Sequence, residues 1–251
     1  AAECIINGAD DFITKPFNGT LLKARVGASL EKKRLRDSED NYLDRVETDK
    51  KRSQQILKTV MPTSVANELQ SSGKVRSRRY DDVAIFICDL VGFTSFCEKN
   101  NPELVVETLQ GLVEKFEKAF EDFGLEKIKT VGDAIVAVAG LSSHTSSPIK
   151  SCVDCAHEIR EIANSASMPW DLHLGIHSGS LVAGTIGTKT VQFDILGQTV
   201  NVAFNICDMS EANQILISSD AWMTARNEIK VKSIGLKRLK SGQDIEMLEC
   251  V

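Results

Sequence analysis

The feature that most constrains the fold is the apolar stretch D-V-A-I-F-I-C at residues 82–88, which ends directly before the acid Asp89. A short run of this kind, rich in β-branched and aromatic residues, is typical of a strand buried within a sheet. Gly92 follows shortly after and allows a sharp turn of the backbone. We therefore expect a buried strand that carries a carboxylate at its end.

Residues 78–251 continue with alternating strand and helix signals. A helix with apolar residues at helical spacing begins at Pro102 and stops before Gly124. The further expected elements are strands at 128–131 and 134–139 joined by Gly132 and Asp133, a helix at 149–166, a strand at 172–177, a glycine-rich hairpin at 181–186 and 191–195, a helix at 199–209, a strand at 215–218 and a terminal strand pair. This order predicts an α+β domain, an antiparallel sheet with helices mostly on one face.

A charged segment, residues 31–76, precedes this domain. A charged helix with only a thin apolar stripe needs a partner helix, so we expect a parallel coiled-coil stalk that transmits a signal. A solvated linker helix is the alternative. Pro62 is expected to begin a new helix. The positions at coiled-coil spacing are Leu43, Val46, Leu57 and Val60, interrupted by Lys50 and Ser53.

Residues 1–30 contain G-A-D-D-F-I-T-K-P-F, a strand signal at 12–14, and then an amphipathic helix. So short a piece cannot bury a core by itself. It closely resembles the last strand and helix of a bacterial response-regulator receiver domain. The resemblance implies that Lys15 contacts a phosphorylated aspartate, which would lie upstream, that the Lys15–Pro16 bond is cis, and that a sensor kinase of a two-component system is a partner. An ordinary strand-turn-helix fragment is the alternative.

The composition argues against several classes of protein. The 35 acidic residues outnumber the 30 basic ones, which disfavours a nucleic-acid binder. No apolar run approaches the roughly 18 residues that span a bilayer, and no leader is evident. The seven cysteines lack framework spacing, which favours free thiols and a cytoplasmic location. Cys152 and Cys155, at C-x-x-C spacing, are expected to be ordinary helix residues.

Asp89 and Asp133 are the first candidates for chemistry. If their strands are neighbours, the two carboxylates converge, and with a nucleotide phosphate they can hold two Mg²⁺ ions for in-line displacement at phosphorus. Taken alone, two such acids are usually solvated turn residues. The helix after Gly92 offers free amide groups that suit phosphate, so Phe93 and Thr94 are expected to contact substrate.

Five sequence motifs favour a functional role for Asp89 and Asp133 over the interpretation as solvated turn residues. With them, residues 78–251 resemble the class III adenylyl and guanylyl cyclases, and M-P-x-x-V-A-x-E-L at 61–69 is typical of the helix that leads into that domain. The resemblance implies a ferredoxin-like fold and two Mg²⁺ or Mn²⁺ ions held by Asp89, the backbone carbonyl of Leu90 and Asp133. The motifs are D-L-V-G-F-T at 89–94, K-I-K-T-V-G-D at 127–133, L-G-I-H-S-G-S-L-V-A-G-T-I-G at 174–187, F-D-I-L-G-Q-T-V-N-V-A at 193–203 and R-L-K-S-G at 238–242.

The same resemblance implies that Lys129 and Asp194 select the purine. Lysine with aspartate marks adenine in this family, whereas guanylyl cyclases more often carry Glu with Cys or a similar residue. The chemistry agrees, because lysine donates to N1 of adenine and aspartate accepts from its exocyclic amine. Guanine reverses both groups, so the wrong purine leaves polar groups unpaired.

The remaining implied site residues lie near the end of the domain. Asn201 matches an asparagine that positions the ribose, and Lys240 matches a lysine that binds the terminal phosphates. Asn205 departs from the pattern, because the family carries there an arginine that stabilises the transferring phosphate. Such an arginine can be worth 10³–10⁵ in rate, so we expect a slow enzyme. Restoring the charge with Asn205→Arg would separate an impaired site from a non-catalytic one.

The implied activity is the conversion of ATP to 3′,5′-cyclic AMP and pyrophosphate in a homodimer. In the family, Asp89 and Asp133 of one subunit would face Lys129, Asp194, Asn201 and Lys240 of the other. A guanylate cyclase and a nucleotide-binding regulatory domain without catalysis are the alternatives. The signature G-G-[DE]-E-F of the diguanylate cyclases does not occur.

Overall fold

The computed structural model describes residues 6, 8, 12, 15, 16, 18–141 and 145–251 of the chain. Contacts divide the chain into two compact units, Ala1–Thr59 and Val60–Val251. The strand expected at 12–14 lies largely outside the described residues. The Lys15–Pro16 peptide bond is cis, as the receiver resemblance implies.

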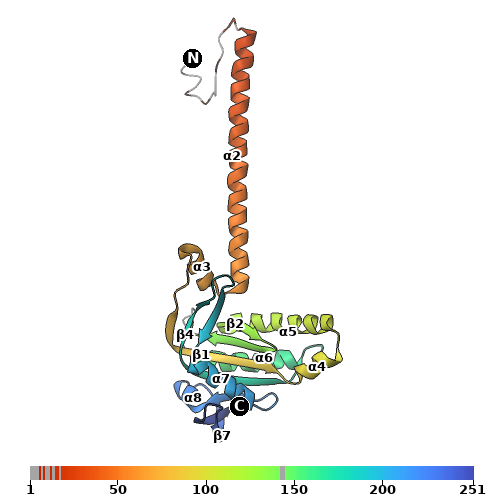
Figure 1. The fold of residues 1–251 in the computed structure, drawn as a ribbon, viewed down its shortest axis with the longest axis vertical. Coiled ribbons are helices and arrows are strands. Elements are labelled where there is room, and N and C mark those ends of the chain that lie inside the picture. Colours follow the sequence, from red (N-terminus) through yellow and green to blue (C-terminus); the bar gives the residue numbers. More distant parts are fainter. Residues whose placement is uncertain (1–5, 7, 9–11, 13–14, 17, 142–144) are drawn as a thin grey trace. The chain divides into compact units, whose positions relative to one another are not determined.

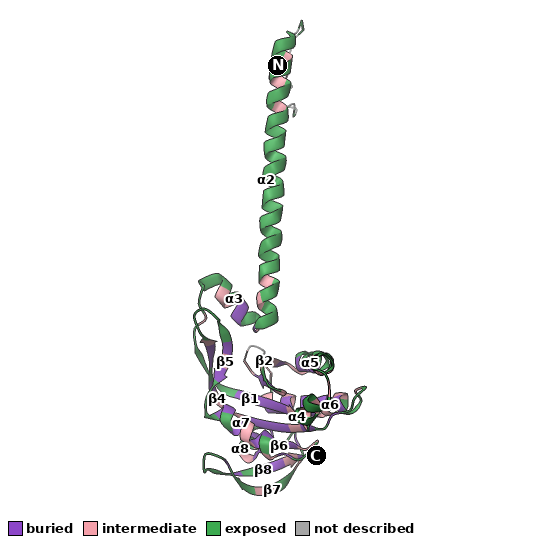
Figure 2. Cartoon of the chain, turned by 45° about the vertical axis from the view of Figure 1, so that its right-hand side comes forward, coloured by how far each residue is buried: buried purple, intermediate pink, exposed green. Residues whose placement is uncertain are grey.

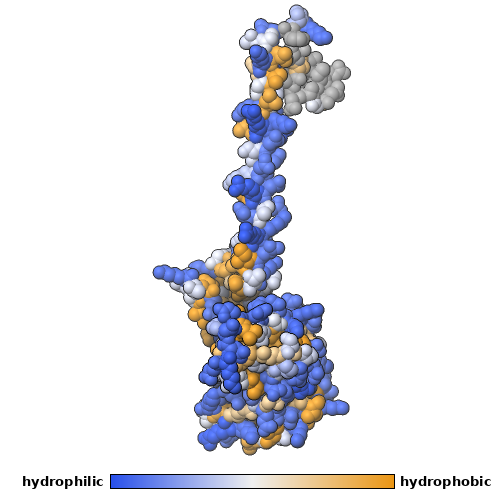
Figure 3. All heavy atoms as spheres, turned by 90° about the vertical axis from the view of Figure 1, so that its right-hand side faces the viewer, coloured by the Kyte–Doolittle hydropathy of each residue, from blue (hydrophilic) through white to orange (hydrophobic). Residues whose placement is uncertain are grey.

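The first unit consists mainly of one long helix, α2 (Gly19–Val60), of 42 residues. It continues without a break through residue 30, so the expected boundary there does not end a helix. No described residue of α2 is buried, and most of the helix is exposed in Figure 2, with a few residues of intermediate burial toward its ends. On the face shown in Figure 3 its hydrophobic side chains gather toward the two ends. No helix among the described residues combines the length and apolar character that a membrane span needs.

An eight-stranded sheet forms the centre of the second unit (Figure 1). Seven strands lie in the order β2-β3-β1-β4-β6-β8-β7, and β5 pairs with β4. Every pair is antiparallel except β4 with β6, which is parallel. The strands are β1 (Arg78–Leu90), β2 (Leu125–Val131), β3 (Ala134–Ala139), β4 (Leu172–Ile186), β5 (Gln192–Leu196), β6 (Ile215–Ser218), β7 (Val231–Arg238) and β8 (Asp244–Cys250).

Two long helices and one short helix contribute to the main core on one face of the sheet. Phe86 of β1 packs edge-on against Phe120, with ring centroids 5.7 Å apart. The Asn101 side chain caps the start of the longest of these helices, and Gly124 ends it in the left-handed conformation. The helices are α5 (Pro102–Phe123), α6 (Pro148–Asn164), which buries Cys152 and Cys155, and α8 (Ser219–Thr224).

Helix α7 (Gln198–Met209) packs against the opposite face. Leu174 and Ile176 of β4 belong to the main core, so Gly175 between them faces the other way. A Cβ atom on Gly175 would lie 2.4 Å from the backbone nitrogen of Cys207 in α7. The glycine therefore lets this helix lie directly on the sheet.

The observed elements confirm the α+β class and differ from expectation in three details. β4 is one strand of 15 residues, where a strand and a separate hairpin arm were expected. Gly179 and Gly184 lie within this continuous strand. The side chains of Thr199 and Ser77 approach these two glycines closely, at the positions where a Cβ atom would lie. The expected sheet was wholly antiparallel, but the β4–β6 pair is parallel. The short helix α8 was not expected.

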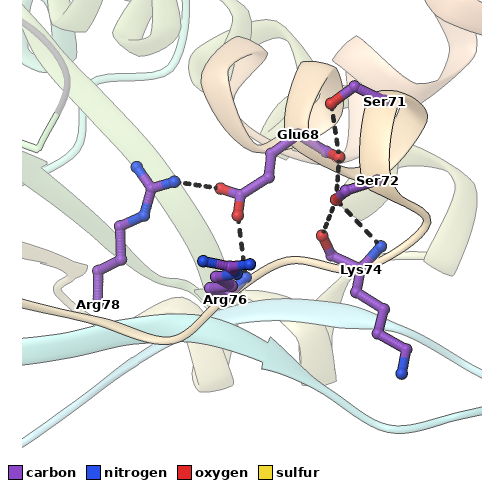
Figure 4. Close-up of polar contacts among 6 residues, drawn as sticks. All are labelled: Glu68, Ser71, Ser72, Lys74, Arg76 and Arg78. Carbon is purple, nitrogen blue, oxygen red and sulfur yellow. Dashed lines mark hydrogen bonds and ion pairs between the residues drawn. The ribbon is translucent and has the colours of Figure 1, made fainter.

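Helix α3 (Thr63–Ser72) begins after Pro62, where a new helix was expected, and belongs to the second unit, in which its Val65 and Ala66 are buried. Glu68 secures it to the start of β1 (Figure 4). Its Oε2 lies 2.8 Å from Nη2 of Arg78, and its Oε1 accepts from the backbone nitrogen of Arg76 at 3.2 Å. This carboxylate therefore ties the entry helix to the sheet.

Candidate active site

The two predicted metal ligands lie together at one end of the sheet. Cys88 pairs with Ile135 in the β1–β3 ladder, which brings the end of β1 beside the turn between β2 and β3 that carries Asp133. Gly132 forms this turn with a φ of 66°. Burial and then the negative charge of Asp133 raise the pKa of Asp89 to about 6, and a hydrogen bond between the two carboxyl groups acts in the same direction.

This donor set suits a divalent cation. Two carboxyl groups in contact repel when both are ionised, and a hard cation with oxygen ligands removes that repulsion. Leu90, whose carbonyl is the third predicted ligand, follows Asp89 in the strand and is buried. No group of three or more His, Cys, Asp or Glu side chains converges anywhere in the described part of the chain, so the side-chain donors here are these two acids.

His173 is a neighbour of this pair that the sequence did not reveal. It lies opposite Asp89 in the β1–β4 ladder, and its charge opposes the rise in the pKa of Asp89. The sequence predicts that His173 lies in a strand, but it does not show which residue of β1 lies opposite His173.

The turn after Asp89 leads into α4 (Phe93–Lys99), and Gly92 makes it with a φ of 77°. The Phe93 ring packs 6.0 Å from the ring of Trp170, so its side chain belongs to the apolar core. Its backbone amide, at the first position of the helix, is the group left for a substrate. Thr94 is exposed.

Lys129 of β2 and Asp194 of β5 form an ion pair. The lysine Nζ lies 2.7 Å from Oδ1 and 2.8 Å from Oδ2 of the aspartate. Only 23% of the lysine side chain and 15% of the aspartate side chain is exposed. Asp194 Oδ1 also accepts from the backbone nitrogen of Ile195 at 2.8 Å. The two predicted base-reading residues are therefore held to each other within one chain.

Asn201, Asn205 and Lys240 meet where α7 contacts the loop between β7 and β8. Asn205 Nδ2 donates to the backbone oxygen of Asn201 at 2.6 Å, and its Oδ1 accepts from the backbone nitrogen of Lys240 at 3.1 Å. Both ends of the Asn205 side chain are thus engaged. The Lys240 ammonium lies 2.5 Å from Oδ2 of Asp208.

Asp208 was missed in the sequence. It lies seven residues after Asn201 and three after Asn205, a spacing that puts all three on one face of a helix. That spacing was a usable signal, but its meaning depends on the loop that brings Lys240 alongside. The structure thus groups the candidates as Asp89 with Asp133, Lys129 with Asp194, and Lys240 with three residues of α7.

The comparison with protein families adds to this geometry. Residues 75–248 match the model of the adenylate and guanylate cyclase catalytic domain. The chain belongs to this family. The cyclase domain therefore accounts for the sheet, for α4 to α8 and for every candidate residue described above.

Related cyclases of several organisms match the chain. A soluble guanylate cyclase of Caenorhabditis elegans is 30% identical over 225 residues, which cover 86% of this chain and 31% of the relative. The human guanylate cyclase soluble subunit alpha-2 is 27% identical over 214 residues, covering 84% and 29%. The chain spans about a third of the length of these relatives.

Solved cyclase structures share the fold. The guanylate cyclase domain of RhGC from Catenaria anguillulae, solved in complex with GTP, aligns with a TM-score of 0.67 at 22% identity, covering 69% of this chain and 98% of that one. The adenylyl cyclase CyaB from P. aeruginosa aligns with a TM-score of 0.64 at 22% identity, covering 70% and 96%. At this identity the likeness concerns the cyclase fold alone.

Proposed function

We propose that the chain is an adenylate cyclase that converts ATP to 3′,5′-cyclic AMP and pyrophosphate. The observation that carries the choice of ATP is the contact between Lys129 and Asp194. A donor and an acceptor held side by side in a largely enclosed position complement N1 and the exocyclic amine of adenine. Guanine presents a donor and an acceptor in the reverse order, so it would leave these partly buried groups unpaired.

Asp89, Asp133 and the Leu90 carbonyl are the groups proposed to hold two Mg²⁺ or Mn²⁺ ions. When bound, such ions supply positive charge that lowers the pKa of the ribose 3′-hydroxyl and neutralises the phosphates. The close approach of the two carboxyl groups supports this assignment. The attack of the 3′-oxygen is in line with the departing pyrophosphate, and substrate or water takes the proton.

Asn201 is proposed to position the ribose, and Lys240 to bind the terminal phosphates. Phe93 and Thr94 are proposed to offer backbone amides at the start of α4. Asn205 brings no charge to the transferring phosphate, and its side chain is already bonded at both ends. The proposed enzyme is therefore slow.

The active form is proposed to be a homodimer with two equivalent sites, each built from the metal acids of one subunit and the base-reading residues of the other. Helix α2 is proposed as the stalk that joins the subunits, since its apolar side chains are exposed in a single chain. A receiver domain upstream, phosphorylated by a sensor kinase, would then control turnover by changing how the two halves meet.

The purine preference gives a direct test. We expect initial rates, measured with Mn²⁺ and with Mg²⁺, to favour ATP over GTP by at least about tenfold, and the double variant Lys129→Glu/Asp194→Cys to reverse that preference. Lys127→Glu makes the same exchange as Lys129→Glu but two residues away, at a lysine paired with Glu117, and should leave the preference unchanged. Asp89→Ala should abolish turnover of either nucleotide.

A faster reaction with GTP in the unaltered chain would instead favour a guanylate cyclase, the activity in the names of the relatives described above. A second alternative is a nucleotide-binding regulatory domain, which the uncharged Asn205 favours. Binding of ATP without any cyclic product, both in the unaltered chain and in Asn205→Arg, would support that alternative.

A further inference from the structure

Two residues of α7 hold Lys240 at two different points. Asn205 accepts from its backbone nitrogen, and Asp208, three residues further along the helix, accepts from its ammonium group. The backbone of the loop is therefore fixed separately from the charged end of the side chain. The inference drawn from this arrangement rests on the proposed function, in which Lys240 binds the terminal phosphates.

We propose that Asp208 is a positioning residue that holds the Lys240 ammonium in the nucleotide-free domain, and that the terminal phosphates of the substrate compete with Asp208 for that ammonium. Because Asn205 anchors the backbone, the exchange needs only rotation about side-chain bonds. The loop that carries Lys240 keeps its place.

The exposure of the pair fits an exchangeable contact. The side chain of Lys240 is 74% exposed and that of Asp208 is 48% exposed, so little packing fixes either one. Exposed ion pairs contribute little to stability, so this one is easily broken. A nucleotide triphosphate presents several charged oxygens to an ammonium, whereas Asp208 presents one carboxylate.

The exchange has a consequence for recognition. Once Lys240 turns to the phosphates, Asp208 is left as an unpaired negative charge near them. A nucleotide that lacks the terminal phosphates does not contact Lys240, so the ion pair between Lys240 and Asp208 stays intact. Asp208 should therefore weaken the binding of nucleoside triphosphates and leave the binding of monophosphates unchanged.

The test compares the full chain with Asp208→Asn, which keeps the shape of the side chain and removes its charge. The probes are 3′-deoxy-ATP, which cannot cyclise, and 3′-deoxy-AMP, titrated calorimetrically in the presence of Mg²⁺. We expect Asp208→Asn to bind 3′-deoxy-ATP about two- to fivefold more tightly and 3′-deoxy-AMP equally well. The KM for ATP should fall by the same factor, while kcat should not rise.

The matched control is Asp154→Asn, which removes the same charge from a partly exposed pair with Lys150 on α6. It should change neither affinity. In a Lys240→Ala background, Asp208→Asn should lose its effect, because Asp208 acts through that lysine. Equal affinities of the unaltered chain and Asp208→Asn for 3′-deoxy-ATP would overturn the inference, as would an equal gain for both probes.

These outcomes are separable from failure of the proposed function. If the chain has no turnover but binds 3′-deoxy-ATP, the effect of Asp208→Asn on that binding still decides the inference. If cyclic AMP is formed but Asp208→Asn changes no affinity, the proposed function stands and the inference fails. A chain that binds neither probe contradicts both.

Discussion

At the residue scale, Asp89 combines a proposed role in metal binding with an environment that favours its protonated form. Its pKa of about 6 means that it holds a proton below that pH, and a cation must displace that proton to bind. We expect the affinity for Mn²⁺ to be nearly constant above pH 7 and about tenfold weaker at pH 5. Titration of free Mn²⁺ by electron paramagnetic resonance measures this. An affinity that is flat between pH 7 and pH 5 would contradict it.

Asn205 changes its meaning once its contacts are known. From the sequence, Asn205 stands where the resembled family carries an arginine, and Asn205→Arg is expected to add only a charge. In the structure the same exchange also removes the acceptor for the backbone nitrogen of Lys240. The measured rate of Asn205→Arg therefore combines two effects: the gain from the new positive charge and the loss of the hydrogen bond that holds the backbone of Lys240.

At the element scale, the contact of α7 with β4 depends on Gly175. A Cβ atom there would lie 2.4 Å from the nitrogen and 2.7 Å from the Cα atom of Cys207, and backbone cannot move aside as a flexible side chain does. We expect Gly175→Ala to lower the free energy of unfolding by about 2 kcal/mol or more, measured by urea denaturation.

The control for that prediction is Gly111→Ala in α5. Nothing lies within 4 Å of a Cβ atom at Gly111, which is exposed in the middle of a helix. This exchange should raise the free energy of unfolding by about 0.5–1 kcal/mol, since alanine is the better helix former. Equal midpoints for Gly175→Ala and the unaltered chain would show that α7 is not held this closely.

Local signals in the sequence were sufficient for many elements. Pro102 and Gly124 were predicted to delimit α5, and they do, because caps act on neighbouring backbone groups. The parallel β4–β6 pair was not predictable, because the residues of a strand do not specify the direction of the strand that pairs with it. The continuity of β4 was not predicted, because Ser77 and Thr199, which lie close to its Gly184 and Gly179, are distant in sequence.

The candidate site shows the same limit. The family resemblance assigned roles to Lys129 and Asp194, but their contact arises only from the meeting of β2 with β5, 65 residues apart in sequence. Asp208 was missed because its partner Lys240 belongs to a loop 32 residues away. The motifs identified the candidate residues of the site. The contacts between their side chains could be seen only in the tertiary structure.

At the scale of the whole molecule, the proposed dimer predicts that two inactive chains can restore activity together. Asp89→Ala lacks a proposed metal ligand, and Asn201→Ala lacks the proposed ribose contact. A mixed dimer combines the intact acids of one subunit with the intact Asn201 of the other, so one of its two sites is whole. After subunit exchange in an equal mixture, we expect about a quarter of the unaltered rate of cyclic AMP formation.

Each variant alone, at the same total concentration, is the control and should be inactive. A mixture no more active than its components would contradict a site shared between subunits. Activity that falls on dilution, and returns on concentration, would give independent support.

The contact between Lys129 and Asp194 also bears on how purine preference can change along a lineage. A chain that loses only one of the two residues retains a charge without its partner in a position that is less than a quarter exposed. Under the proposed reading of adenine by this pair, such an intermediate has lost the fit to adenine and has not gained the fit to guanine. A stepwise change of the proposed preference would therefore pass through a poorly active intermediate.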